Sequence, residues 1–157
     1  MKQKLRILFV SSEYPPETGG GGIGSSVASI GPGLSARSHE VHVLSCSHLQ
    51  AHRDYMDNGV HIHRRGILPA PLFYAFKLLP WPESVARVRS GAAAYYWYRR
   101  LSRQYKFDVV EYADWHAEGL FLSLLKRHGT GAHLHTPLLV LAKYGERPLT
   151  RDLRLAA

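Results

Sequence analysis

Apolar residues fall along this chain in two alternating patterns. Short continuous apolar runs, of which Leu5–Val10 is the first, are typical of strands buried on both faces of a sheet. Between them lie segments in which apolar residues recur every three or four positions, the spacing of an amphipathic helix. The short runs predict strands at Leu5–Val10, Val41–Ser47, Val60–Arg64, Phe107–Tyr112 and Ala132–His135.

The segments between these runs predict helices. They lie at Ser25–Arg37, at about Glu83–Gln104 and at Glu118–Arg127. Gly31-Pro32-Gly33 is expected to kink the first helix, because proline removes a backbone donor, and Gly129 is expected to end the last. Alternation of strands with helices predicts an α/β fold with a doubly wound, mostly parallel sheet of the Rossmann-like type.

The composition fits one globular domain with an anionic partner. A chain of 157 residues is long enough to bury one hydrophobic core. Its formal net charge of +8 favours a nucleotide, an anionic lipid or a nucleic acid as partner. The single cysteine, Cys46, excludes an internal disulfide framework and is expected in the core rather than as a nucleophile. Without a signal-peptide pattern or a run of 18 apolar residues, a cytoplasmic protein is expected.

Four consecutive glycines, Gly19–Gly22, follow the first strand and a loop with two prolines, and Gly24 adds a fifth. Glycine has no Cβ, so the backbone can approach a ligand closely there. The N-terminus of the following helix offers backbone N–H groups to an anion. Residues 19–26 are therefore a candidate site for a phosphate or a sugar phosphate.

These glycines allow three other interpretations: a dinucleotide fingerprint, a P-loop and a flexible surface turn. Gly19, Gly21 and Gly24 match the G-x-G-x-x-G dinucleotide fingerprint, but that motif directly follows its strand and needs a later acidic residue. The second strand ends here in the sequence SCS, which argues against a nicotinamide cofactor. Residues 19–26 also approach the P-loop pattern, but Ser25 stands where that loop requires lysine. A flexible surface turn is the remaining alternative.

Several short motifs in register resemble a known enzyme family. They read PPETGGGGIG, SHEVHVLS, FDVVEYADWHAEG and HLHTPL. In this order and spacing they resemble the amino-terminal domain of retaining GT-B glycosyltransferases, and within these the large family 4. The resemblance implies transfer of a sugar from a nucleotide diphosphate sugar to an acceptor, with retention at the transferred carbon and without a further cofactor.

One position departs from the pattern of this family. Its members usually carry glycine before the His-Glu-Val that opens the second strand, and this chain has Ser38. If the backbone there is left-handed, serine costs on the order of 1 kcal/mol relative to glycine. The departure concerns stability and not chemistry.

Candidate site residues follow the ends of the predicted strands, where doubly wound sheets bind their ligands. The resemblance implies that His135 lies near the reaction centre and stabilises the pyrophosphate of the donor; a structural histidine is the alternative. Candidates for the donor phosphate are Gly21, Gly22 and Gly24. Candidates for the acceptor are Tyr14, Glu17, Asp114, Trp115 and Thr136.

Four of the five acceptor candidates have a plainer alternative. Asp114 is equally suited to cap the predicted helix at Glu118–Arg127, with Trp115 packing against that helix. Tyr14 and Glu17 fit simple loop surface. His133 and His135 form an H-x-H pair of the kind found in some zinc sites, but no third ligand with supporting spacing appears, so no metal is expected.

The helix predicted at about Glu83–Gln104 mixes arginines with aromatic residues. Such a mixture fits either a membrane or nucleic-acid surface, or an amphipathic helix on the sheet with its arginines in water. We favour the second interpretation. Of the functional options we prefer an anionic membrane surface, since enzymes of the resembled type often use lipid-linked acceptors, and the apolar loop Leu68–Trp81 would add an anchor. No nucleic acid is expected.

Residues of the donor-binding half are missing from this sequence. Family members place the nucleotide sugar in a carboxyl-terminal domain with two glutamates eight positions apart, and no glutamate pair here has that separation. We therefore expect residues 1–157 to form one acceptor-side domain that lacks its donor-binding partner. The alternative is a non-catalytic acceptor- or membrane-binding module that needs a partner chain.

Overall fold

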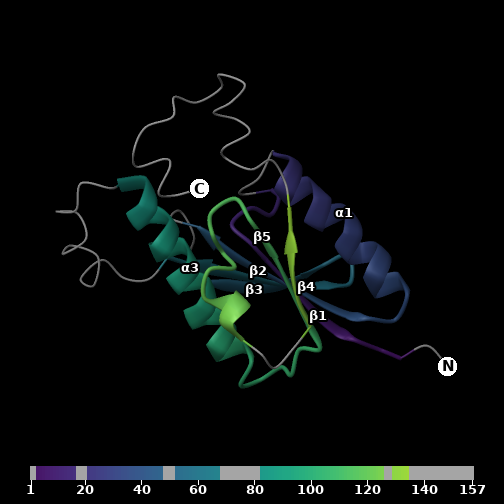
Figure 1. Cartoon of the computed structure of the whole chain (residues 1–157). Helices are drawn as coiled ribbons and strands as arrows, with labels where there is room; N and C mark the ends of the chain where they lie inside the picture. The colour runs from purple at the N-terminus through teal and green to yellow at the C-terminus, as the bar shows by residue number, and fades with distance from the viewer. Residues whose placement is uncertain (1–2, 17–20, 48–51, 68–81, 126–128, 135–157) are drawn as a thin grey trace.

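The computed structural model describes residues 3–16, 21–47, 52–67, 82–125 and 129–134. They form a six-stranded sheet in the order β3-β4-β2-β1-β5-β6. The strands are β1 (Arg6–Ser11), β2 (Glu40–Ser47), β3 (Arg53–Asp57), β4 (Val60–Gly66), β5 (Val109–Ala113) and β6 (Gly129–His133). The helices are α1 (Gly22–Ala36), α3 (Pro82–Leu101) and the short 3₁₀ helix η2 (Leu122–Leu124). Helices α1 and α3 lie on opposite faces of the sheet (Figure 1).

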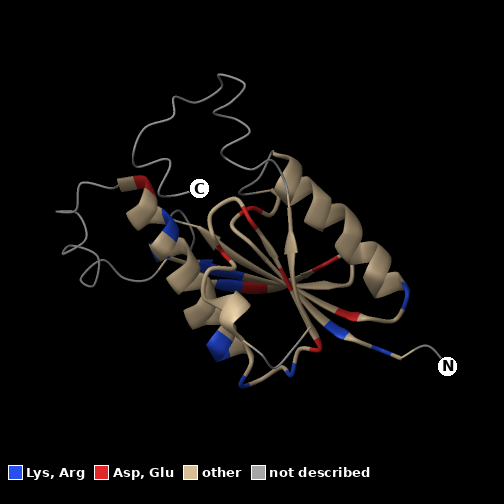
Figure 2. Cartoon of the chain, viewed as in Figure 1, with Lys and Arg blue, Asp and Glu red and all other residues tan. Residues whose placement is uncertain are grey.

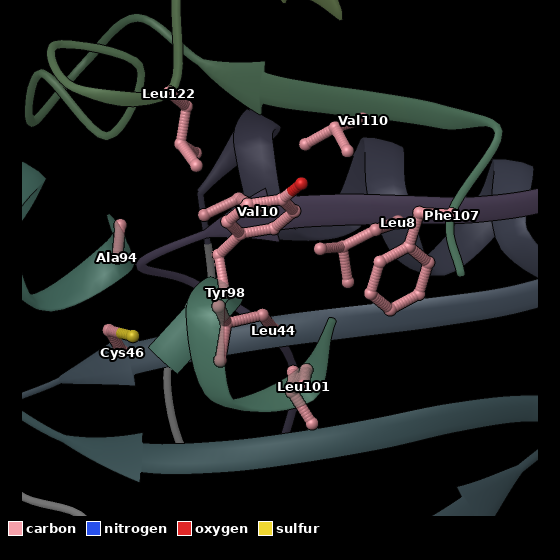
Figure 3. Close-up of a cluster of buried hydrophobic side chains, with 10 residues drawn as sticks. All are labelled: Leu8, Val10, Leu44, Cys46, Ala94, Tyr98, Leu101, Phe107, Val110 and Leu122. Atoms are coloured by element: carbon pink, nitrogen blue, oxygen red, sulfur yellow. The ribbon is translucent and has the colours of Figure 1, made fainter. Parts of the chain in front are cut away.

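Strand β1 is at the centre of the sheet and is buried on both faces. It pairs in parallel with β2 on one side and with β5 on the other. Leu8 and Val10 belong to a cluster that includes Tyr98 of α3 and Leu122 of η2 (Figure 3). Ile7 and Phe9 join the cluster on the opposite face, against α1. The apolar run at β1 is therefore continuous because the strand is buried on both faces, as predicted. The doubly wound α/β sheet is confirmed.

Strand β3 was not predicted from the sequence. It pairs antiparallel with β4 in a hairpin whose two turn residues are Asn58 and Gly59. Both have positive φ, 46° and 81°, as a type I′ turn requires. Asn-Gly is the strongest short signal for such a turn, so the hairpin could have been found from the sequence. Its polar pattern, RDYMD, hid the strand.

The predicted helix at Glu118–Arg127 is wrong for the residues that the structure describes. Residues 114–120 form turns, and only η2 is helical. Ala117 has φ of 56°, which no right-handed helix accepts. Glu118 turns its side chain inward, and Gly119 lies so close to the ring of Tyr112 that a Cβ would collide with it. Tertiary contacts therefore override the helical spacing.

Other boundaries moved by a few residues. Helix α1 begins at Gly22 rather than Ser25 and continues through Pro32 as one element. Gly129 does not end a helix; it is the first residue of β6. Cys46 is buried in β2, and burial raises the pKa of its thiol to about 12, so it is a core residue as expected.

Ser38 occupies the left-handed position that the sequence analysis considered, with φ of 71°. It follows the C-cap Arg37 of α1 in a Schellman arrangement. The N–H of Ser38 donates to the carbonyl of Ser35 at 2.9 Å, and the N–H of His39 donates to that of Leu34 at 3.3 Å. Serine thus stands where the backbone favours glycine.

Replacing Ser38 by glycine is expected to stabilise the protein by about 1 kcal/mol, because glycine adopts positive φ without a Cβ clash. Urea unfolding measures the gain. Ser29→Gly is the matched control: Ser29 is exposed inside α1, where glycine lowers helix propensity and should cost about 0.5 kcal/mol. Stabilisation by both changes, or by neither, would contradict the explanation.

Candidate functional site

The carboxyl ends of β1 and β5 meet at the switch point of the sheet. From β1 the chain proceeds through α1 to β2 on one side, while β5 lies on the other side of β1. Open α/β sheets bind ligands in the crevice at such a reversal. The loops after Ser11 and after Ala113 therefore define the candidate site.

A buried carboxylate joins these two loops. Glu118 is 1% exposed, and its Oε1 accepts the backbone N–H of Ser12 at 3.2 Å. Its Oε2 accepts the N–H of His116 at 2.9 Å. Two donated hydrogen bonds offset the cost of taking this carboxylate out of water. Glu118 thus fixes the two loops relative to each other.

Ser12 and His116 lie side by side as a result. The hydroxyl of Ser12 is 2.8 Å from Nδ1 of His116, and the His116 side chain is 44% exposed. Oε1 of Glu118 is 3.8 Å from the same ring nitrogen. A hydroxyl and an imidazole at the open side of the crevice can exchange hydrogen bonds with a ligand hydroxyl or phosphate.

The glycine segment forms the first turn of α1 at the same edge. Gly21 is the N-cap residue with extended backbone (φ −89°), and Gly22 begins the helix. No side chain caps this end, and α1 carries neither acidic nor basic residues (Figure 2). A Cβ on Gly22 would meet nothing within 4 Å, whereas Gly24 is buried. Among the described glycines only Gly59 has positive φ, so a left-handed surface turn does not account for Gly21, Gly22 or Gly24.

Glu13 stands at the entrance to this helix end. A Cβ on Gly21 would lie 3.1 Å from its Oε2, so the missing side chain leaves room for a carboxylate. The positive end of the helix dipole attracts such a negative charge. The N-terminus of α1 therefore already has an anionic neighbour, with which a phosphate would compete.

Tyr14 is buried away from the crevice. It is 1% exposed, its hydroxyl donates to Oδ2 of Asp57 at 2.8 Å, and burial raises its pKa. The guanidinium of the buried Arg64 lies 5.6 Å from the Tyr14 ring centroid and donates to the carbonyl of Pro15 at 2.7 Å. These contacts hold the loop after β1 against β3 and β4. Contact between Tyr14 and an acceptor stays a prediction.

The structure describes two of the other predicted site residues, Asp114 and Trp115. Asp114 and Trp115 lie half-buried in the turn after β5. No helix starts there for Asp114 to cap, and the carbonyl of Trp115 accepts a hydrogen bond from Nη1 of Arg87 in α3. Glu17, His135 and Thr136 lie outside the described residues. Their roles stay predictions.

His133, the described member of the H-x-H pair, bonds to a carboxylate. Its Nδ1 is 2.8 Å from Oε1 of Glu111, across β5 and β6. This contact was not anticipated.

Ser12, His116 and Glu118 are the functional candidates that the sequence analysis did not select. The motif EYADWHAEG contains two of them, but Glu118 was assigned only as the first residue of a predicted helix. The spacing H-x-E after a strand is too short a signal to reveal a buried carboxylate. Its inward direction depends on the positive φ of Ala117.

The arginine-aromatic helix is largely the amphipathic helix that we favoured. Arg99 and Arg100 are exposed and lie over the rings of Tyr95 and Tyr96, while Tyr98 is buried. Arg87 and Arg89 are half-buried rather than in water. Across the described part of the chain, no helix is both long and apolar enough to cross a membrane.

Changing Glu118 to glutamine is expected to lower the free energy of unfolding by about 1–3 kcal/mol, because the amide cannot accept both backbone N–H groups. Glu111→Gln is the matched control: the Glu111 side chain is 32% exposed, and its loss should cost about 0.5 kcal/mol or less. Chemical denaturation measures both. Equal effects would show that Glu118 does not hold the two loops.

Comparison with known proteins identifies the family. Residues 21–157 match the glycosyl transferase 4-like domain. Among curated proteins, no sequence matches the chain. The fold resembles the catalytic domain of starch synthase IV from Arabidopsis thaliana, solved with ADP and acarbose, with a TM-score of 0.60 at 16% identity over 85% of this chain and 34% of that one. An α,α-trehalose 6-phosphate synthase from Burkholderia multivorans matches with a TM-score of 0.53 at 15% identity, over 98% and 36%.

These matches agree in fold and in extent. The chain spans about a third of the length of the solved structures that it matches. The α,α-trehalose-phosphate synthase (UDP-forming) from Burkholderia vietnamiensis gives the same proportion, 38%, at 15% identity and a TM-score of 0.50. The chain belongs to the glycosyl transferase 4-like family and has the fold of the amino-terminal half of a GT-B glycosyltransferase.

Proposed function

We propose that this domain is the acceptor-binding half of a retaining glycosyltransferase that uses a nucleotide diphosphate sugar. The donor-binding half is supplied either by the same polypeptide or by a partner chain. The observation that carries the proposal is the position of the α1 N-terminus at the switch point, beside the loops that hold Ser12 and His116. Membership of the glycosyl transferase 4-like family supports the reaction class.

The N-terminus of α1 is the proposed contact for the donor phosphates. The first-turn N–H groups of any helix lack intrahelical acceptors, and the helix dipole favours an anion there. Gly22 adds no side chain on the approach to them, and no acidic residue lies within the first turn. A phosphate carries more negative charge than the Glu13 carboxylate and can displace that flexible side chain. ADP bound to the starch synthase supports a nucleotide as one ligand of this fold.

The loop after β5 is the proposed acceptor side. The imidazole of His116 and the hydroxyl of Ser12 offer polar contacts to a sugar hydroxyl, and Trp115 is suited to stack on a sugar face. The backbone hydrogen bonds of Glu118 keep both loops in place when the substrate binds. Retention would follow from front-face attack, in which the leaving phosphate helps to take the proton of the acceptor. His135 is proposed to stabilise that phosphate.

The 157-residue chain by itself is expected not to turn over a nucleotide sugar, because donor and acceptor must be held together for transfer. Incubation with labelled UDP-, GDP- and ADP-sugars, with and without a donor-binding half from the family, measures hydrolysis and transfer. Robust turnover by the single domain would contradict the proposed separation into an acceptor-binding half and a donor-binding half. No transfer with any donor half would favour a non-catalytic binding module instead.

Gly22→Val in an enzyme completed with a donor half is expected to raise KM for the nucleotide sugar by roughly tenfold or more, since a lost phosphate contact costs about 1.5–3 kcal/mol. The melting temperature should change by only a few degrees, because a Cβ at Gly22 meets nothing. The matched control is Gly33→Val, near the other end of α1, where a Cβ also meets nothing. A KM that changes equally in both variants, or in neither, would rule out the glycine segment as a phosphate contact.

A further inference from the structure

The start of β2 carries a row of stacked histidine rings, remote from the switch-point crevice. His42 is fully buried, and its ring stacks on that of His61 with centroids 4.6 Å apart and on that of His63 at 5.3 Å. Strands β2 and β4 pair in parallel with His42 opposite His61, which places the rings on one face of the sheet. None of these three histidines was predicted as a site residue from the sequence.

A continuous chain of close polar contacts runs through the row. Oδ1 of Asp54 is 2.7 Å from Nδ1 of His63, and Nε2 of His63 is 3.0 Å from Nδ1 of His42. Nε2 of His42 is in turn 3.1 Å from Oε1 of Glu40. Each of these three contacts needs one proton, but two neutral imidazoles supply only one N–H each and the carboxylates supply none. One contact therefore brings two lone pairs together, unless a third proton or a metal cation lies there.

The imidazole of His61 lies beside the contact between His42 and Glu40. Within the described part of the chain, no hydrogen bond engages its ring nitrogens, although the side chain is half-buried. One ligand atom each from Glu40, His42 and His61 lie within 4.8 Å of one another. His61 lines a hollow of about 370 Å³, and Glu40 lines another of about 340 Å³, so an ion can reach the cluster from solvent.

We propose that Glu40, His42 and His61 bind a divalent transition-metal ion of the zinc type. Imidazole nitrogen and carboxylate oxygen are ligands that Zn²⁺ takes at about 2.0–2.2 Å, and a water molecule completes a tetrahedron. Mg²⁺ and Ca²⁺ prefer sites made of oxygen alone. The ion replaces the missing proton between His42 and Glu40, so all three contacts of the chain are satisfied.

Neighbouring side chains orient the proposed ligands by hydrogen bonds, as the residues around a metal ligand do in zinc sites. With Nε2 of His42 on the ion, its Nδ1–H donates to His63, and the Nδ1–H of His63 donates to Asp54. Arg6 holds both carboxylate oxygens of Glu40, with its Nε 2.8 Å from Oε1 and its Nη2 2.8 Å from Oε2, so the ion would share Oε1 with Arg6.

Closing the site requires a small movement. Tetrahedral bonds of about 2.0–2.1 Å bring ligand atoms to about 3.4 Å from one another, so separations of up to 4.8 Å must shorten by as much as about 1.4 Å. His42 is enclosed between Tyr105, Phe107 and the other rings. His61 is only half-buried and turns most easily. The ion would join β2 to β4 at the edge opposite the carboxyl ends, where its role is structural.

The test is Zn²⁺ binding by the 157-residue chain after chelator treatment, measured against a chromophoric competitor. We expect one Zn²⁺ per chain, a higher melting temperature with Zn²⁺ and no such effect of Mg²⁺. Co²⁺ should give the intense visible bands of a tetrahedral ion. Absence of stoichiometric binding, or equal binding of Mg²⁺, would overturn the proposal.

Variants locate the ion. His61→Ala and Glu40→Gln should each lower Zn²⁺ affinity by roughly 100-fold or more, since changes to outer groups alone cost about 10–100-fold. His61→Cys should keep tight binding and add a thiolate-to-cobalt charge-transfer band, which separates loss of a ligand from loss of fold. His133→Ala is the matched control, because it removes another histidine that is bonded to a glutamate in a strand. Unchanged affinity in His61→Ala, or lost affinity in His133→Ala, would overturn the site.

Discussion

The burial of β1 on both faces is the constraint on which the rest of this domain depends. Five of its six residues are buried, and it pairs in parallel with β2 and β5. A strand in that position needs an apolar layer on each side, and α1 and α3 supply the two layers. Because the chain turns to one side of β1 and later returns on the other, the crevice at its carboxyl end follows from the same arrangement.

Glu118 fixes the two loops that line that crevice. Loops beyond strand ends are otherwise free to vary, since few apolar contacts hold them. Here one buried carboxylate accepts a backbone N–H from the loop after β1 and another from the loop after β5. The Ser12–His116 pair and the N-terminus of α1 are thereby presented at the same edge. In the proposed two-domain glycosyltransferase, this fixed edge would face the donor-binding domain.

The two ends of the sheet carry different chemistry. At the carboxyl end, Ser12, His116 and the first turn of α1 are open to ligands. Toward the other end, His42 and its neighbours form a row of contacts enclosed by aromatic rings. The first arrangement fits the reaction of the family and the second fits a structural ion.

The sequence by itself determined the central parallel strands and the helices α1 and α3, and it predicted a ligand site at the carboxyl ends of those strands. Continuous apolar runs reveal buried strands, and helical spacing reveals α1 and α3, because both patterns record burial along a local period. The Asn-Gly turn of the β3–β4 hairpin was readable as well, although a polar strand obscured it. Only the tertiary structure decided the direction of the Glu118 side chain, the burial of Tyr14 and the stacking of His42 on His61. Those depend on a positive φ at Ala117, on Asp57 across the fold and on the register of two strands. A local pattern cannot specify them, because each partner is distant in sequence or is set by a backbone angle that residue type alone does not dictate.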